Sequence, residues 1–119
     1  MLVLDDESSI RLLCRVNLEL EGYRVLEAKS LTEGRRILDS ERVDVLLIDV
    51  HVGHEDGREL VRELRARDAP TRVALLTGTV DLSSAERGGA DAVLEKPFQL
   101  DALVNTVRRL ESGIDSATT

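Results

Sequence analysis

Short apolar runs alternate along the chain with segments in which apolar residues recur at helical spacing. The short runs are rich in branched residues and have the length of strands. Five strands are predicted, at Leu2–Asp6, Tyr23–Ala28, Val43–Asp49, Arg72–Thr77 and Asp91–Glu95. A helix is predicted after each of them, at Ser8–Glu21, at Ser30–Ser40, in a segment that carries Leu60, Val61 and Leu64, at Leu82–Arg87 and at Gln99–Glu111.

Polar residues and glycines mark the ends of these helices. Ser8 and Asp56 are predicted to cap the N-termini of their helices, and Ser30 begins a segment with the spacing of a capping box. Gly22 and Gly113 are predicted to end the first and the last helix.

Strict alternation of strands and helices predicts a parallel sheet covered by helices on both faces, because right-handed crossovers permit little else. The expected fold is therefore a three-layer, doubly wound α/β fold. With 119 residues the chain has the length of one domain. We expect this domain to span residues 1–112, and residues 113–119 to be a tail or the start of a linker.

Composition excludes several classes of function. The net charge of −7 argues against binding to nucleic acid or to an anionic membrane by this chain alone. Cys14, the single cysteine, falls inside an apolar helical pattern and is expected to be a buried, unreactive thiol. The longest apolar run is only as long as a strand, and no signal peptide is evident, so we expect a cytoplasmic location.

Polar side chains stand at the carboxyl end of four predicted strands. They are Asp5 with Asp6, Asp49, Thr77 and Lys96. The carboxyl ends of the strands form the edge of a doubly wound sheet at which ligands bind. A lone Asp at a strand end is usually a turn or helix cap. Four such strand ends at one edge instead predict a functional site.

Charge repulsion suggests what this site binds. If the first and third strands are neighbours, Asp49 lies about 5 Å from the acidic pair. Two carboxylates at about 5 Å repel by about 3 kcal/mol at an effective dielectric of about 20, so three of them need a cation or have to take up protons. Mg²⁺ prefers oxygen ligands, whereas zinc would need more His and Cys ligands than the chain has. Together with the ammonium of Lys96 and the hydroxyl of Thr77, the metal would make a receptacle for a phosphoryl group.

These residues resemble those of a known family, the receiver domains of bacterial two-component response regulators. The segments that carry the resemblance are LVLDDE, LLIDVHVGHEDG, ALLTG and GADAVLEKPF, and together they cover nearly the whole chain. Each motif alone is weak, but their order and their place at strand ends are highly specific. The resemblance implies a flavodoxin-like, five-stranded parallel sheet with strand order 2-1-3-4-5.

The resemblance also implies partners and a metal. Asp49 would accept a phosphoryl group from a phosphohistidine of a sensor histidine kinase or a histidine phosphotransfer protein. Asp6 and Asp49 would ligate Mg²⁺, for which Mn²⁺ can substitute, with Asp5 helping through water. The backbone carbonyl of His51 would complete the protein ligands.

Further roles follow from the same resemblance. Thr77 and Lys96 would bind phosphoryl oxygens, and the Lys96–Pro97 peptide bond would be cis. The chain would then take part in its own phosphorylation and dephosphorylation without being a turnover enzyme. An output domain could follow the C-terminus, and homodimer formation is left open.

Three departures from the family pattern concern signalling. Gly53 stands where relatives often have Pro, and Val93 stands where they commonly have a Tyr or Phe that swings inward on activation. The segment from Thr77 to Lys96 is about three residues shorter than usual. We expect the activation signal to be weak or to travel through the Gly53 loop. His51 and Thr79, each two residues beyond a site residue, are predicted to tune the lifetime of the phosphoryl group.

Other interpretations remain. Phosphatases of the haloacid dehalogenase type also use a strand-end Asp, but they place a second Asp where this chain has His51. A degenerate receiver that only mediates protein contacts would not need the acceptor, the acidic pair, the Thr and the Lys together. A flavin-binding relative would have a loop rich in Gly, Ser and Thr after the first strand, and here that loop is acidic. His51, His54 and the arginines Arg58, Arg62 and Arg65 are expected to face solvent.

Overall fold

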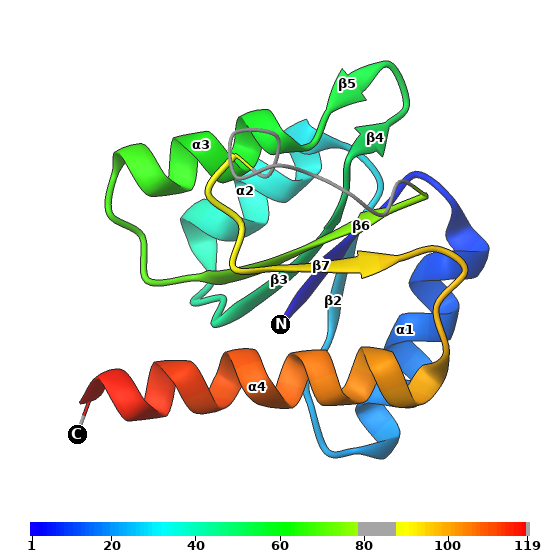
Figure 1. The fold of residues 1–119 in the computed structure, drawn as a ribbon. Coiled ribbons are helices and arrows are strands. Elements are labelled where there is room, and N and C mark those ends of the chain that lie inside the picture. The colour runs from blue at the N-terminus through cyan, green and yellow to red at the C-terminus, as the bar shows by residue number, and fades with distance from the viewer. Residues whose placement is uncertain (79–87, 119) are drawn as a thin grey trace.

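Five parallel strands form the central sheet of the protein (Figure 1). The structure is a computed structural model that describes residues 1–78 and 88–118. The strands are β1 (Leu2–Leu4), β2 (Leu26–Ala28), β3 (Val45–Asp49), β6 (Arg72–Thr77) and β7 (Ala92–Glu95). Their order is β2-β1-β3-β6-β7, which confirms the predicted 2-1-3-4-5 topology. Two short antiparallel strands, β4 (His51–Val52) and β5 (Glu55–Asp56), form a separate hairpin that was not predicted.

Helices cover both faces of the sheet. The described helices are α1 (Ser8–Leu20), α2 (Leu31–Ser40), α3 (Arg58–Ala66) and α4 (Leu100–Thr118). The helices α2 and α3 lie on one face and α1 and α4 on the other (Figure 1), which confirms the three-layer prediction. The predicted helix at Leu82–Arg87 lies outside the described residues.

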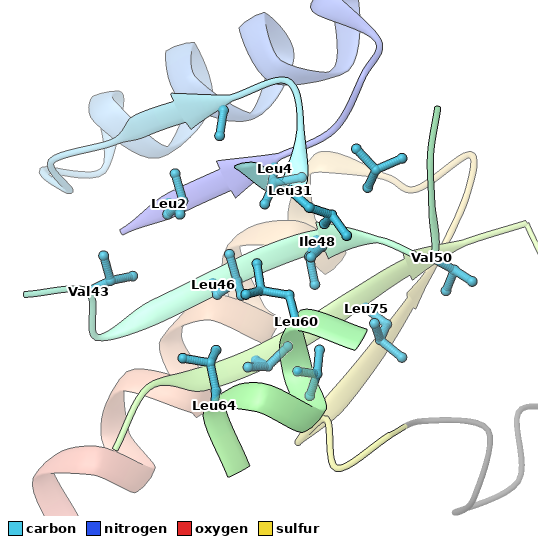
Figure 2. Close-up of a cluster of buried hydrophobic side chains, with 14 residues drawn as sticks. Leu2, Leu4, Leu31, Val43, Leu46, Ile48, Val50, Leu60, Leu64 and Leu75 are labelled. Carbon is cyan, nitrogen blue, oxygen red and sulfur yellow. The ribbon is translucent and has the colours of Figure 1, made fainter. Parts of the chain in front are cut away.

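Alternation along the central strand divides the interior into two cores. In β3 the side chains of Leu46 and Ile48 join the cluster under α2 and α3, which Figure 2 shows in close-up. The side chains of Val45 and Leu47 join the cluster under α1 and α4. Because both faces are covered, all five residues of β3 are buried, and Asp49 is the only polar residue among them.

Two of the predicted helix signals are confirmed. The Ser30 side chain accepts a hydrogen bond from the amide of Glu33 at 3.2 Å, so Ser30 is the N-cap of α2. Gly22 has a φ of 93° and follows the end of α1. The prediction for Ser8 is wrong, because Ser8 is already helical and Glu7 occupies the N-cap position without a side-chain cap. The Asp5 carboxylate accepts a hydrogen bond from the amide of Glu7 at 3.0 Å. The turn between β1 and α1 is therefore stabilised by a residue that precedes the helix.

Asp56 contributes to the start of α3, although Gly57 occupies the N-cap position. Its carboxylate accepts the amide of Arg58 at 2.9 Å and is also held by the Arg58 guanidinium, 2.8 Å from Nη2. These hydrogen bonds hold the pKa of the Asp56 carboxyl below its usual value.

The predicted end of the last helix is wrong. α4 continues through Gly113 to Thr118. Glycine ends a helix when it adopts a positive φ, as Gly22 does, and Gly113 is not among the glycines with positive φ.

Two of the three arginines expected to face solvent are bound instead. Arg58 holds Asp56, and Arg65 donates to the carbonyl oxygens of Gly89 and Thr71 at 2.9 Å each. Arg62 is exposed as expected. His51 and His54 are exposed as well, which confirms their predicted place at the surface.

Cys14 is fully buried among the apolar residues between α1 and the sheet. Burial raises the pKa of its thiol to about 12, so the thiol stays protonated at neutral pH. The prediction of an unreactive, packed cysteine therefore agrees with its environment. Among the described helices, none combines the length and the apolar character that crossing a membrane requires.

Candidate functional site

Strand register places two of the predicted site carboxylates side by side. β1 and β3 pair in parallel through Leu4 and Ile48, so the next residue of each strand, Asp5 and Asp49, stands level with the other at the carboxyl edge of the sheet. Asp5 is completely buried, and Asp49 is 8% exposed. The apolar strands thus hold two acidic groups in a largely desolvated position.

The last pair of strands brings in Thr77 and Lys96. Thr77 pairs with Glu95 at the end of β6 and β7, and the amide of Lys96 donates to the Thr77 carbonyl oxygen at 2.7 Å. Thr77 is buried. The Lys96–Pro97 peptide bond that follows is cis, as the resemblance implies.

The ammonium of Lys96 bridges the two buried carboxylates. Its Nζ atom lies 2.7 Å from Oδ2 of Asp5 and 2.9 Å from Oδ2 of Asp49. Burial alone would lower the pKa of Lys96, but the hydrogen bonds to Asp49 and Asp5 outweigh burial and raise it. Lys96 is therefore a fixed positive charge at neutral pH.

Asp5 has a partner at each of its polar atoms. Its amide donates to the carbonyl of Ala28 at 3.1 Å, and Oδ1 accepts the amide of Glu7 at 3.0 Å. Oδ2 binds Lys96, and the carbonyl oxygen accepts from Nη1 of Arg11 at 2.6 Å. Burial still raises the pKa of the Asp5 carboxyl, against the opposing effect of Lys96. Asp5 is thus the least available of the three carboxylates for a direct metal bond.

Asp5, Asp6 and Asp49 together could hold a metal ion. One carboxylate oxygen of each lies within 4.8 Å of the others, and Asp6 is exposed to solvent. An all-oxygen donor set with an open side suits a hard cation that keeps part of its water, such as Mg²⁺. We name these three residues with Lys96 the acidic pocket.

The β4–β5 hairpin begins two residues after Asp49. Oδ1 of Asp49 accepts the amide of His51, the first residue of β4, at 3.0 Å. Gly53 and His54 form the two-residue turn, and Gly53 has a φ of 62°. A glycine with positive φ at the first turn position is typical of a type II′ hairpin. The loop predicted around Gly53 is therefore a hydrogen-bonded hairpin whose first strand is held at its base by the Asp49 side chain.

Gly57 closes the other end of this hairpin. Its amide donates to the carbonyl of Val50 at 2.8 Å. A Cβ atom at position 57 would collide with the carbonyl oxygen of Asp49 and would also press on Ile48. Only glycine allows the chain to pass this close to the backbone of Asp49.

Two of the predicted tuning or switch residues are not placed in this cluster by the described residues. Thr79 lies outside the described residues. Val93 is partly buried and packs against the core under α2 and α3, in register with Leu75. The structure brings together Asp5, Asp6, Asp49, Thr77 and Lys96, with His51 joined to them through its amide.

The sequence interpretation missed the roles of Gly57 and Arg11. The sequence pattern assigns the start of α3 to Asp56 and gives its neighbour Gly57 no role, although a glycine between a loop and a helix can signal close backbone approach. No feature of the sequence pointed to Arg11. Its contact with the carbonyl oxygen of Asp5 depends on how α1 packs relative to the turn between β1 and α1.

Known proteins resemble this chain over most of its length. The family model described as response regulator receiver domain matches residues 1–108. The C4-dicarboxylate transport transcriptional regulatory protein DctD of Pseudomonas aeruginosa is 37% identical over 115 residues, which cover 92% of this chain and 24% of DctD. Response regulator MprA of Mycobacterium ulcerans is 34% identical over 113 residues, covering 92% of this chain and 49% of MprA. The chain thus spans a quarter to a half of these relatives.

Solved receiver domains share the fold. The receiver domain of NtrX from Brucella abortus superposes with a TM-score of 0.85 at 27% identity, covering 93% of this chain and 97% of that one. The chemotaxis response regulator CheY4 of Vibrio cholerae gives a TM-score of 0.84 at 30% identity, covering 92% and 95%. From the matched family model, the relatives and the sheet topology together, this chain belongs to the response regulator receiver domain family of two-component signalling.

Proposed function

We propose that Asp49 is the phosphoacceptor of this receiver domain and that the acidic pocket works with Mg²⁺. The observation that carries the proposal is the bridge of Lys96 between Asp5 and Asp49, at 2.7 and 2.9 Å, in a pocket with three carboxylates and a single ammonium. Packing does not require this surplus of negative charge.

In the proposed step an Asp49 oxygen attacks the phosphorus of a phosphohistidine. A new O–P bond forms, the N–P bond breaks, and the imidazole leaves with its electron pair. Lys96 and Thr77 bind phosphoryl oxygens. The buried end of β3 holds Asp49 in place. Asp6 and Asp49 would hold Mg²⁺ or Mn²⁺, with Asp5 through water and the His51 carbonyl, and the metal would neutralise charge on the transferred group.

This proposal treats the domain as a phosphoacceptor without sustained turnover. The position that a haloacid dehalogenase-type phosphatase gives to a general acid is His51 here, and its side chain is exposed. A phosphomonoester assay separates the two activities, because continuous release of phosphate would contradict the receiver proposal.

The phosphoryl donor is proposed to be a sensor histidine kinase or a histidine phosphotransfer protein. Such a donor has to cover the rim of the pocket, and α1 begins two residues after Asp6. α1 exposes Leu13, Val16 and Leu20, whose spacing matches the packing seam of another helix. We infer that a helix of the donor packs there. Val16→Asp should then slow transfer from a kinase and leave labelling by acetyl phosphate unchanged.

Several expectations stay predictions. The receiver unit is proposed to be residues 1–112, and its location is proposed to be the cytoplasm. In a longer protein, an output domain would respond to the signal.

Without an aromatic residue at Val93, we propose that the signal travels through the β4–β5 hairpin. Amide exchange with and without beryllofluoride tests this route, and changes confined to residues 79–95 would contradict it. His51→Ala should alter the decay of the acyl phosphate without abolishing its formation.

Intact-mass measurement after incubation with acetyl phosphate and Mg²⁺ tests the central proposal. The chain should gain one phosphoryl group, and Asp49→Asn should gain none. Asp44→Asn, at an exposed carboxylate ahead of the same strand, is the matched control and should be labelled normally. Full labelling of Asp49→Asn would show that the acceptor lies elsewhere.

A further inference from the structure

Arg11 reaches from α1 back over the turn that carries the acidic pair. Its Nη1 atom donates to the carbonyl oxygen of Asp5 at 2.6 Å, and its Nε atom donates to Oε1 of Glu27 at 3.3 Å. Helical side chains slant toward the N-terminus of their helix, so a residue at this point of α1 covers the preceding turn. The Arg11 side chain is only 15% exposed, which makes it part of the wall behind the acidic pocket.

Glu27 anchors this arginine from the neighbouring strand. It lies on β2, and its second oxygen, Oε2, accepts from Nη1 of Arg15 at 2.6 Å. Arg15 also approaches Glu19 at 3.7 Å. Among the described residues both arginines bind Glu27, but of the two only Arg11 also binds Asp5. The pair therefore offers a natural control for any effect of the Asp5 contact.

The contact of Arg11 acts on Asp6 through the backbone. The carbonyl oxygen of Asp5 and the amide of Asp6 belong to one planar peptide group. The Asp5 amide is fixed by Ala28, so the hydrogen bond from Arg11 fixes the orientation of the next peptide. Within the described part of the chain, the Asp6 side chain makes no hydrogen bond of its own. Its direction thus depends on the backbone that Arg11 holds.

We propose that Arg11 is a positioning residue for the metal: anchored by Glu27, it holds the Asp5–Asp6 peptide so that the Asp6 carboxylate faces the cation shared with Asp49. This inference rests on the proposed function, because it concerns the metal that the phosphoryl transfer uses. By its charge alone, Arg11 would weaken cation binding. The test therefore has to keep the charge and remove the geometry.

Mn²⁺ binding to the whole chain, followed by the electron paramagnetic resonance signal of the free ion, measures the effect directly. Arg11→Lys keeps the charge but lacks the fork that spans Asp5 and Glu27. Loss of such a supporting contact should weaken Mn²⁺ binding about tenfold. Arg15→Lys, which loses a comparable contact with Glu27, should change binding less than about twofold. Urea unfolding of both variants checks that each chain is folded under the conditions of the binding measurement.

Phosphorylation gives a second readout. In Arg11→Lys the Mg²⁺ concentration for half-maximal labelling by acetyl phosphate should rise about as much as the Mn²⁺ dissociation constant, while the rate at saturating Mg²⁺ stays close to that of the unchanged chain. Glu27→Gln weakens the ion pair that anchors Arg11 and leaves the arginine itself in place. This variant should also weaken Mn²⁺ binding, and it replaces Arg11→Lys in the test if Arg11→Lys fails to fold.

Unchanged Mn²⁺ binding in Arg11→Lys would overturn the inference, as would an equal loss in Arg15→Lys. Either result leaves the proposed function standing, because Asp49 could still be labelled. A chain that is not labelled at Asp49 at any Mg²⁺ concentration would instead refute the proposed function itself.

Discussion

The carboxylates at the two edges of the sheet differ in how many positively charged partners they have. At the carboxyl edge, the acidic pocket gathers three carboxylates around one ammonium, that of Lys96, which binds two of them, Asp5 and Asp49. At the amino edge, the single carboxylate of Asp91 is bound by Arg65 at 2.7 Å, approached by Arg72 at 3.6 Å and hydrogen-bonded by the amide of Val73 at 2.9 Å. We call this second group the Asp91 cluster.

The difference separates a functional site from a structural one. In the Asp91 cluster the positive charges outnumber the negative charge, and the network ties the start of β7 to α3 and β6. In the acidic pocket negative charge exceeds positive charge, and two of the three carboxylates, Asp5 and Asp49, are buried, which costs stability. Such a surplus supports the proposal that this edge binds a cation and a phosphoryl group.

Removing the cation at each edge should give the largest contrast. Lys96→Met leaves Asp5 and Asp49 buried without a counter-charge and should lower the free energy of unfolding by about 3 kcal/mol. Millimolar Mg²⁺ should restore part of this loss, since it can neutralise the same carboxylates. Arg65→Met should cost about 1 to 2 kcal/mol, because its ion pair is partly exposed, and Mg²⁺ should not restore it.

Urea unfolding of both variants and the unchanged chain, with and without Mg²⁺, measures these differences. Equal stabilisation of the two variants by Mg²⁺ would contradict the distinction between the edges. So would a Lys96→Met chain that is as stable as the parent.

Removing the acid at each edge should give effects of opposite sign. Asp49→Asn relieves the repulsion with Asp5 and Asp6 and leaves Lys96 paired with Asp5, so we expect a gain of about 1 kcal/mol without metal. Asp91→Asn should lose about 1 kcal/mol, because Arg65 keeps only a neutral acceptor.

The midpoints of thermal unfolding at low ionic strength and without divalent ions compare the two substitutions. Salt should shrink both shifts, since both are electrostatic. A destabilised Asp49→Asn chain would mean that Asp49 is held as a structural group like Asp91, against the interpretation of the acidic pocket.

Most of the acidic pocket could be predicted from the sequence, because its residues follow apolar runs. Strand periodicity locates Asp5, Asp49 and Lys96 of the pocket, and Thr77 beside it, at strand ends, and parallel pairing brings those ends to one edge. The Asp91 cluster could not be predicted in this way. Arg65 lies on a helix face whose sequence pattern predicts exposure, and its acceptors Gly89 and Asp91 lie more than twenty residues further along the chain.

Turns account for the remaining differences. The β4–β5 hairpin has strands of two residues each, too short to show a period, and its register depends on the φ of Gly53. The sequence does not reveal the φ of a glycine. Gly22 has a positive φ and follows the end of α1, whereas Gly113 does not and lies inside α4, and the sequence alone could not separate the two.

The smallest expected effect tests where α4 passes the amino edge. The Gly113 carbonyl lies 3.5 Å from Nη2 of Arg72, the arginine that approaches Asp91, so a continuous helix at this point joins the Asp91 cluster to α4. Among the described residues, apart from its chain neighbours and the backbone of its own helix, no atom lies within 4 Å of a Cβ built on Gly113. Gly113→Ala should therefore raise the free energy of unfolding by about 0.5 to 1 kcal/mol, because alanine favours a helix interior over glycine. Urea unfolding measures the change, with Gly22→Ala as the control that should lose stability at its positive φ. If Gly113→Ala also lost stability, Gly113 would end the helix, and the link between the Asp91 cluster and α4 would be absent.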